Sequence, residues 1–236
     1  MLVDVALSPA EIALLPGRDL SEVTCVVFDV LRATSSMITA FAHGAAEMHP
    51  VRTIEEALAL RAKIPGAVLA GERHGEPIPG FDIGNAPHEY TGLAGRAIIT
   101  TTTNGTVALR ACERARRVLV GALLNLRAIA DELRRERPPR VLLVCAGTFE
   151  EFALEDAFAA GALIAELAPP QLTDAAHAAL SVARSFSTPL DALRLARNGA
   201  ALAQKGRAAE VEWCARCSAF KVVAQMQQAI IRPLVK

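Results

Sequence analysis

The sequence has no excess of charge of either sign. Its 236 residues include 25 Lys and Arg and 25 Asp and Glu, so the formal net charge is zero. Proteins that bind nucleic acid without sequence preference usually concentrate basic residues on one surface. The balance therefore argues against a nucleic-acid partner.

Long apolar runs are also missing, although 52% of the residues are hydrophobic. No run approaches the eighteen or so residues that span a bilayer. The first residues, MLVDVALSPAE, contain an early acid and no basic lead-in, unlike a secretory signal. We therefore expect a cytoplasmic protein without a membrane partner, and we leave a homo-oligomer open.

Cysteines are few and odd in number: Cys25, Cys112, Cys145, Cys214 and Cys217. Three of them fall within or beside apolar segments, so we expect reduced thiols. The pair Cys214 and Cys217 has the spacing of a redox or zinc motif, but it lies inside a helical pattern, and no second pair of ligands matches it. We interpret both as ordinary helical cysteines.

Strand and helix patterns alternate through the first 148 residues. Apolar or alternating runs predict strands at 2–7, 25–28, 45–51, 67–70, 96–104, 117–121 and 141–145, and helical patterns separate most of them. This alternation favours an α/β fold with a mainly parallel sheet and helices on both faces.

The pattern changes after residue 148. Helical periods cover 151–168, 173–185, 189–203 and 208–217, and only 220–223 resembles a further strand. We expect residues 1–148 to form the α/β core that carries the turns at the strand ends. Residues 149–236 should form a mostly helical carboxyl-terminal portion, packed on the same core or forming a smaller second subdomain.

The stretch from Cys25 to Gly44 carries the clearest sign of chemistry. A buried strand ends on Asp29, the chain turns past Arg32 and Thr34, and a helix follows. In open α/β sheets, ligands bind outside the carboxyl ends of the strands, where helix amino termini offer free N–H groups. An acid able to hold a metal and an arginine able to grip an oxyanion predict a phosphate ester or a similar anion. The alternative is that Asp29 or Thr34 merely caps the helix.

Residues 71–87, GERHGEPIPGFDIGNAP, interrupt the alternation with four glycines and three prolines. We expect neither helix nor regular strand here, but a loop docked through its apolar residues. Glu72 follows a strand at the same sheet edge as Asp29, so it is either a second oxygen ligand or a solvated loop acid. Asn85 either contacts the ligand or makes a local turn.

Two further strand ends add polar groups to this edge. Thr102, Thr103, Asn104 and Gly105 lie where a strand meets a helix, which suits an anion or a capping turn. The strand 141–145 ends beside Ala146-Gly147-Thr148, and the adjacent acids Glu155 and Asp156 follow. We expect one of these two acids to face solvent, although either could turn back to the site.

In this order, FDVLRATSSMITAFAHGA, GERHGEPIPGFDIGNAP, TTTNGT and LVCAGT followed by LED resemble the 2-phosphosulfolactate phosphatase family. These are magnesium-dependent phosphohydrolases named for a step in coenzyme M biosynthesis, and the resemblance runs from about Leu2 to Cys214. It implies hydrolysis of 2-phospho-3-sulfolactate, a small anionic phosphate ester, to 3-sulfolactate and phosphate, with Mg²⁺ as cofactor. It also implies a set of residues around the active site: Asp29, Arg32, Thr34, Glu72, Asn85, Thr102, Thr103, Asn104, Gly105, Cys145, Glu155 and Asp156.

Within that set we assign roles by chemistry. We expect Asp29, Arg32 and Glu72 to be catalytic. The carboxylates expected to hold the metal are Asp29, Glu72, Glu155 and Asp156. The residues expected to bind substrate or phosphate are Arg32, Thr34, Asn85, Thr102, Thr103, Asn104, Gly105 and Cys145. The family pattern has an aspartate before a valine where this chain has Glu210 and Val211, a difference that we expect to matter little for the chemistry.

Two alternatives remain at this stage. VVFD and ITTTTN are similar to the first two motifs of haloacid-dehalogenase phosphatases, which form an aspartyl-phosphate. That scheme needs a second aspartate where this chain has Leu31 and an acid where it has Cys145-Ala146-Gly147. We therefore rank it below attack by magnesium-activated water. The second alternative is a non-catalytic binder of a small anionic metabolite.

Overall fold

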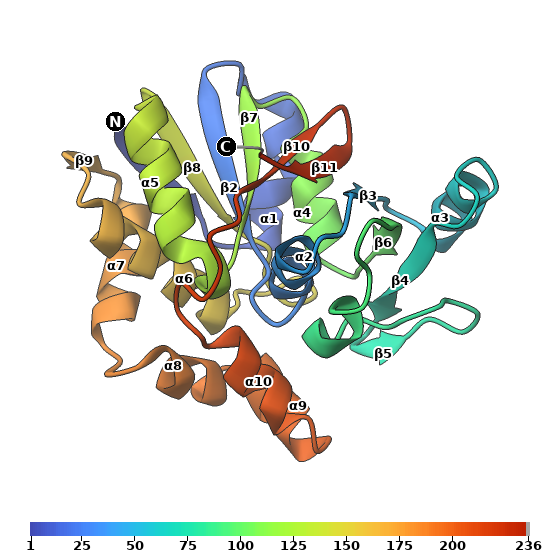
Figure 1. The fold of residues 1–236 in the computed structure, drawn as a ribbon. Helices are drawn as coiled ribbons and strands as arrows, with labels where there is room; N and C mark the ends of the chain where they lie inside the picture. The colour runs from blue at the N-terminus through green and yellow to red at the C-terminus, as the bar shows by residue number, and fades with distance from the viewer. Residues whose placement is uncertain (235–236) are drawn as a thin grey trace.

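The computed structural model describes residues 1–234, and their strands form one eleven-stranded sheet (Figure 1). The strand order is β5-β4-β6-β3-β11-β10-β7-β2-β8-β1-β9. None of the helices in this described part is both long and apolar enough to cross a membrane.

The larger parallel part of the sheet holds the central motif. It contains β7 (Arg117–Gly121), β2 (Val23–Phe28), β8 (Arg140–Cys145), β1 (Leu2–Ala6) and the short β9 (Gln171–Leu172). In β2, Cys25 lies opposite Leu142 of β8, so the two apolar runs at 25–28 and 141–144 are neighbours. A second parallel part contains β3 (Glu47–Pro50), β6 (Ala97–Thr101) and β4 (Val68–Arg73). The predicted α/β fold with a mainly parallel sheet is confirmed.

Helices cover both faces of this sheet, and β2 is therefore buried on both sides. Cys25 and Val27 pack with residues of α1 (Pro9–Ala13), α2 (Ala33–Ala42) and α4 (Gly105–Ala111). Val26 and Phe28 point the other way and pack with α5 (Leu126–Glu136), α6 (Leu154–Leu167) and α7 (Asp174–Arg184). Alternate residues of a strand face opposite sides, so an unbroken apolar run requires two covered faces. A separate small core lies under α3 (Ile54–Arg61).

The carboxyl-terminal portion is mostly helical, as predicted, but one expected helix is two. The pattern over 189–203 divides into α8 (Pro189–Leu195) and α9 (Arg197–Gln204), with Ala196 extended at ψ 143° between them. The corner is tight, because a Cβ on Gly199 would lie 1.7 Å from the carbonyl oxygen of Leu193. The glycine therefore permits a bend that the helical period conceals.

The last two strands were not predicted correctly. The strand expected at 220–223 forms as β10 (Ala224–Gln227), and a second strand, β11 (Ile230–Pro233), pairs with it. Gln228 and Ala229 make the connecting turn with φ of 50° and 59°, without the Asn-Gly or Asp-Gly signal that usually marks such turns. This hairpin runs antiparallel between β7 and β3 and joins the two parallel parts into one sheet (Figure 1).

Two other expectations are corrected. The loop predicted from residue 71 contains regular structure, because β4 continues to Arg73 and pairs with β5 (Glu76–Pro77) across a turn at His74 and Gly75. Of the two cysteines assigned to one helix, Cys214 ends α10 (Ala208–Cys214), whereas Cys217 is exposed beyond it. All five cysteines are free thiols.

Candidate active site

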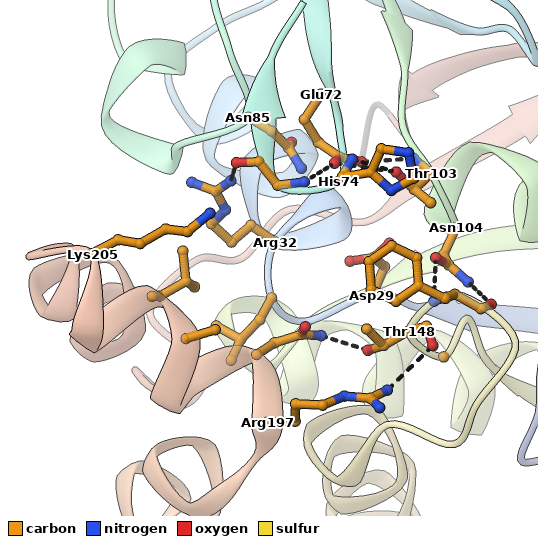
Figure 2. A pocket seen from close by; sticks show the side chains of 17 residues that line it. Asp29, Arg32, Glu72, His74, Asn85, Thr103, Asn104, Thr148, Arg197 and Lys205 are labelled. Atoms are coloured by element: carbon orange, nitrogen blue, oxygen red, sulfur yellow. Dashed lines mark hydrogen bonds between the residues drawn. The ribbon is translucent and has the colours of Figure 1, made fainter.

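A cavity of about 310 Å³ opens at the carboxyl ends of the strands (Figure 2). Asp29 reaches it from the end of β2, Glu72 from β4, Thr103 and Asn104 from the turn after β6, and Gly147 from the turn after β8. The turns of four strands therefore meet at one hollow, as expected for a ligand site in an open α/β sheet.

The twelve candidate residues divide into two groups by their position. Asp29, Arg32, Glu72, Asn85, Thr103 and Asn104 line the cavity. Thr34, Thr102, Gly105, Cys145, Glu155 and Asp156 lie outside its lining.

Asp29 is fixed by the turn that precedes α2. Its Oδ1 accepts the N–H of Ala33 at 3.0 Å, and the hydroxyl of Thr34 donates to the Asp29 carbonyl at 2.9 Å while accepting the Asp29 N–H at 3.0 Å. Burial raises the pKa of Asp29 to about 7, although the hydrogen bond from the Ala33 N–H lowers it. The charges of the nearby Glu72 and Glu155 add to the rise, and the charge of Arg32 opposes it. Thr34 therefore bonds to the backbone of its own turn, whereas Asp29 accepts the first N–H of α2 and also faces the cavity.

Glu72 is not a solvated loop acid. Its Oε1 accepts the N–H of Thr103 at 2.6 Å, and its Oε2 accepts the N–H of Gly75 at 2.7 Å and the Thr103 hydroxyl at 3.2 Å. The same hydroxyl accepts the N–H of His74 at 3.2 Å. Glu72 and Thr103 thus tie the β4–β5 turn to the turn after β6.

Asn104 performs a similar task on the other side. Its Nδ2 donates to the carbonyls of Ala146 at 3.1 Å and Phe149 at 2.8 Å, and its Oδ1 accepts the Phe149 N–H at 3.0 Å. The ring of Phe149 stacks on His74 with centroids 5.5 Å apart. Both aromatic rings line the cavity, so Asn104 helps to shape its wall.

The candidates outside the lining have local partners. Thr102 and Thr106 exchange backbone N–H to hydroxyl bonds of 3.0 and 3.1 Å, which is capping geometry. Cys145 ends β8 within the apolar core, and burial raises the pKa of its thiol well above the usual range. Asparagine or threonine at a strand end can serve either purpose, so sequence alone does not separate the two roles.

Neither Glu155 nor Asp156 faces solvent, which corrects the expectation for this pair. Asp156 accepts the N–H of Val30 at 2.8 Å and that of Gly147 at 3.0 Å. Glu155 accepts the Nδ2 of Asn198 at 2.7 Å. Burial raises the pKa of both acids, and for Asp156 the charges of Glu155 and Asp29 add to the effect. They lie behind the cavity wall, turned toward the site.

Sequence reasoning missed one whole wall, which α9 supplies. Arg197, Asn198, Ala201 and Leu202 line the cavity from this helix, and Lys205 lines it from the residue that follows the helix. Lys205 pairs with Glu76 of β5, Arg197 pairs with Glu151, and Asn198 donates to the Thr148 hydroxyl at 2.6 Å. Arg197, Ala201 and Lys205 recur every four residues, so their common face was detectable, but not the direction in which it points.

Comparison with known proteins shows where this arrangement belongs. A sequence model of the 2-phosphosulpholactate phosphatase family matches residues 11–229. The chain belongs to this family. The resemblance found in the motifs is therefore confirmed over most of the chain.

Individual members of the 2-phosphosulpholactate phosphatase family match this chain over most of its length and of their own. A probable 2-phosphosulfolactate phosphatase of Carboxydothermus hydrogenoformans is 40% identical over 95% of this chain and 93% of its own length. The protein of the same name from Deinococcus radiodurans is 42% identical over 89% and 90%, and that of Thermotoga maritima is 37% identical over 88% and 90%.

The carboxylates of this family member suit Mg²⁺ in their chemistry. Within residues 1–234, no three His, Cys, Asp or Glu side chains form a ready metal-binding group. Mg²⁺ is commonly held by one or two carboxylates together with waters and the substrate phosphate, so a group of three is not required. Asp29 and Glu72 both line the cavity, and the charge of Glu72 raises the pKa of Asp29. A divalent cation would relieve that repulsion.

The bonds of Asp156 predict a structural effect when it is replaced. In Asp156→Asn, the amide NH₂ would face one of the two backbone N–H groups that the carboxylate now accepts. Loss of the negative charge beside Glu155 and Asp29 offsets part of the cost of the unsatisfied buried group, so we expect the free energy of unfolding to fall by about 1 kcal/mol. Urea unfolding measures this, with the exposed Asp131→Asn on α5 as the control. Parental stability with lost activity would instead favour the metal-binding role for Asp156.

Proposed function

We propose that this chain is a Mg²⁺-dependent phosphatase for a small phosphorylated 2-hydroxy acid that carries a second anionic group. On the names of its relatives, the substrate is 2-phospho-3-sulfolactate and the products are 3-sulfolactate and phosphate. The observation that carries the proposal is the cavity itself, whose lining combines the buried Asp29 and Arg32 with two further cations, Arg197 and Lys205.

The charges of the cavity suit such a substrate. A phosphate monoester is a dianion, and its transfer is accelerated mainly by groups that neutralise and orient it. Arg32 can donate to a phosphate oxygen from one wall, while Arg197 and Lys205 lie eight residues apart on α9, roughly 12 Å along the helix. Cations on two walls can hold a phosphate and a separate sulfonate or carboxylate.

The carboxylates have the complementary task. Asp29 and Glu72 are the residues that would hold Mg²⁺, which when bound supplies positive charge to the phosphate. Asp29 is held in place by the Ala33 N–H, and Glu72 by Thr103 and Gly75. His74 and Phe149, whose rings stack on each other, form part of the cavity wall beside these groups.

The test compares substrates and metal together. Phosphate release is measured on phosphorylated 2-hydroxy acids that carry a sulfonate, a carboxylate or neither, with Mg²⁺ and with a chelator. We expect release to rise with Mg²⁺ and kcat/KM to be highest for substrates with the second anionic group. Tight binding of these compounds without turnover would replace the proposal with a metabolite-binding role.

A further inference from the structure

Glu210 of α10 lies in contact with Arg32, the arginine of the cavity wall. Its Oε2 accepts from Arg32 Nη1, and its Oε1 accepts from Arg207 Nε at 2.7 Å. Both guanidinium groups also reach the carbonyl of Gly75, from Arg32 Nη2 at 3.4 Å and Arg207 Nη1 at 3.3 Å. Four groups from α10, the β2–α2 turn and the β4–β5 turn therefore meet at one point beside the cavity.

The charges of this cluster do not cancel. Glu210 and Arg32 are both buried, with 7% and 4% of their surface exposed, so each needs an ionic partner. Burial opposes ionisation of Glu210, but hydrogen bonds from Arg207 and Arg32 lower the pKa of this carboxyl. One carboxylate between two arginines leaves a net charge of about +1, so Arg32 is held without losing its attraction for an anion.

The geometry of Arg32 leaves it able to act on a ligand. Within residues 1–234, its guanidinium makes two hydrogen bonds, to Glu210 and Gly75, out of the five N–H donors that an arginine has. Arg32 also lines the cavity. Its remaining donors are directed by the two bonds, because a planar guanidinium fixed at two points has no rotation left.

We propose that Glu210 is a positioning residue that fixes the Arg32 guanidinium in the orientation that grips the substrate's phosphate group, an inference that rests on the proposed function. It reverses the expectation that the difference at position 210 matters little. The carboxyl-terminal helices then contribute to the site twice, through the α9 wall and through Glu210 behind Arg32.

The test distinguishes a role of Glu210 in orienting Arg32 from a purely structural role in holding α10 in place. Variants Glu210→Gln, Glu210→Asp, Arg32→Lys and the double variant Glu210→Gln/Arg32→Lys are compared by kcat, KM and thermal melting. We expect E210Q to lower kcat/KM about tenfold or more, the scale of a charge-assisted hydrogen bond, and E210D to lose less because it keeps the charge. The double variant should match R32K alone, since Glu210 acts through Arg32.

A matched control lies on the same helix. Glu212 is exposed and pairs with Arg194, so Glu212→Gln should leave kcat/KM at the parental value. If E210Q does not fold, the same double-variant comparison is made with E210D. Losses in kcat/KM that add in the double variant, or melting temperatures that fall with unchanged kcat/KM of the folded protein, overturn the proposal.

Binding of inorganic phosphate distinguishes this inference from the proposed function. Calorimetry should show weaker phosphate binding in E210Q than in the parent, whether or not the parent turns over any ester. If the parent releases no phosphate from any substrate but E210Q still weakens phosphate binding, the proposed function fails and the positioning role stands. If the parent is active and E210Q binds phosphate and turns over as the parent does, the positioning role fails alone.

Discussion

Replacing Asp29 with asparagine should lower phosphate release by about two to three orders of magnitude, the scale seen when a preorganised electrostatic group is removed from an active site. Asparagine keeps the side-chain oxygen that accepts the Ala33 N–H, so the turn before α2 remains capped. It removes the charge that would hold Mg²⁺. Added Mg²⁺ should therefore restore only part of the activity in a titration of the phosphate-release rate.

Although Asp29→Asn should lose activity, its thermal stability should not fall. Burial is the main cause of the raised pKa of Asp29, and the charges of Glu72 and Glu155 add to it, so a neutral side chain relieves both costs. We expect Asp29→Asn to melt at or above the parental temperature, while the exposed Asp131→Asn changes neither activity nor melting. A variant that melts far below the parent, yet has normal turnover per folded molecule, would make Asp29 a structural residue.

Gly105→Ala should disable the same site by crowding it. A Cβ at this position would lie 2.6 Å from Asp29 Oδ2 and 2.7 Å from the Cβ of Ala33, so Asp29 must move. A displacement of about 1 Å in a catalytic group can cost on the order of a hundredfold in rate. We expect a loss of that size in kcat, with a fall of about 1–3 kcal/mol in the free energy of unfolding from overpacking.

Gly92→Ala is the control for this variant. A Cβ on Gly92 meets nothing within 4 Å, so activity and stability should stay parental. Gly105 was predicted to bind the substrate with its amide, but it lies outside the cavity lining, and its contact with Asp29 gives a different reason for a glycine. Parental kcat in Gly105→Ala would show that Asp29 tolerates displacement and would weaken its assigned role.

The sequence identifies the sheet edge better than the individual roles on it. Asp29, Glu72 and Thr103 follow apolar strands, and the carboxyl ends of parallel strands share one edge, so their convergence follows from simple periodicity. Thr34 and Thr102 have the same position in the pattern, yet the Thr34 hydroxyl donates to the Asp29 carbonyl and the Thr102 hydroxyl accepts the Thr106 N–H, both within their own turns. Short polar side chains form local and ligand bonds with similar ease, and only coordinates distinguish them.

Other parts depend on contacts between distant segments. The cavity wall on α9 requires α8 and α9 to bend at Ala196, and the helical pattern runs through that bend. The glutamate at position 210 was expected to matter little because its partner Arg32 lies far away in the chain. The last hairpin combines polar residues with Ala224, Met226 and Ile231, which are buried in the core, and it pairs with sheet neighbours on both sides that lie far away in the chain.

The hairpin at 224–233 also determines the order in which the chain can fold during synthesis. Within residues 1–234, the nine other strands are made before it, and until it is made, β3 and β7 each lack a neighbour on one side. Exposed edges invite pairing with other chains, and non-local pairings form slowly. The two parallel parts can therefore join into one sheet only once the hairpin has been made, and until then the open sides of β3 and β7 are the edges at which pairing with other chains would begin.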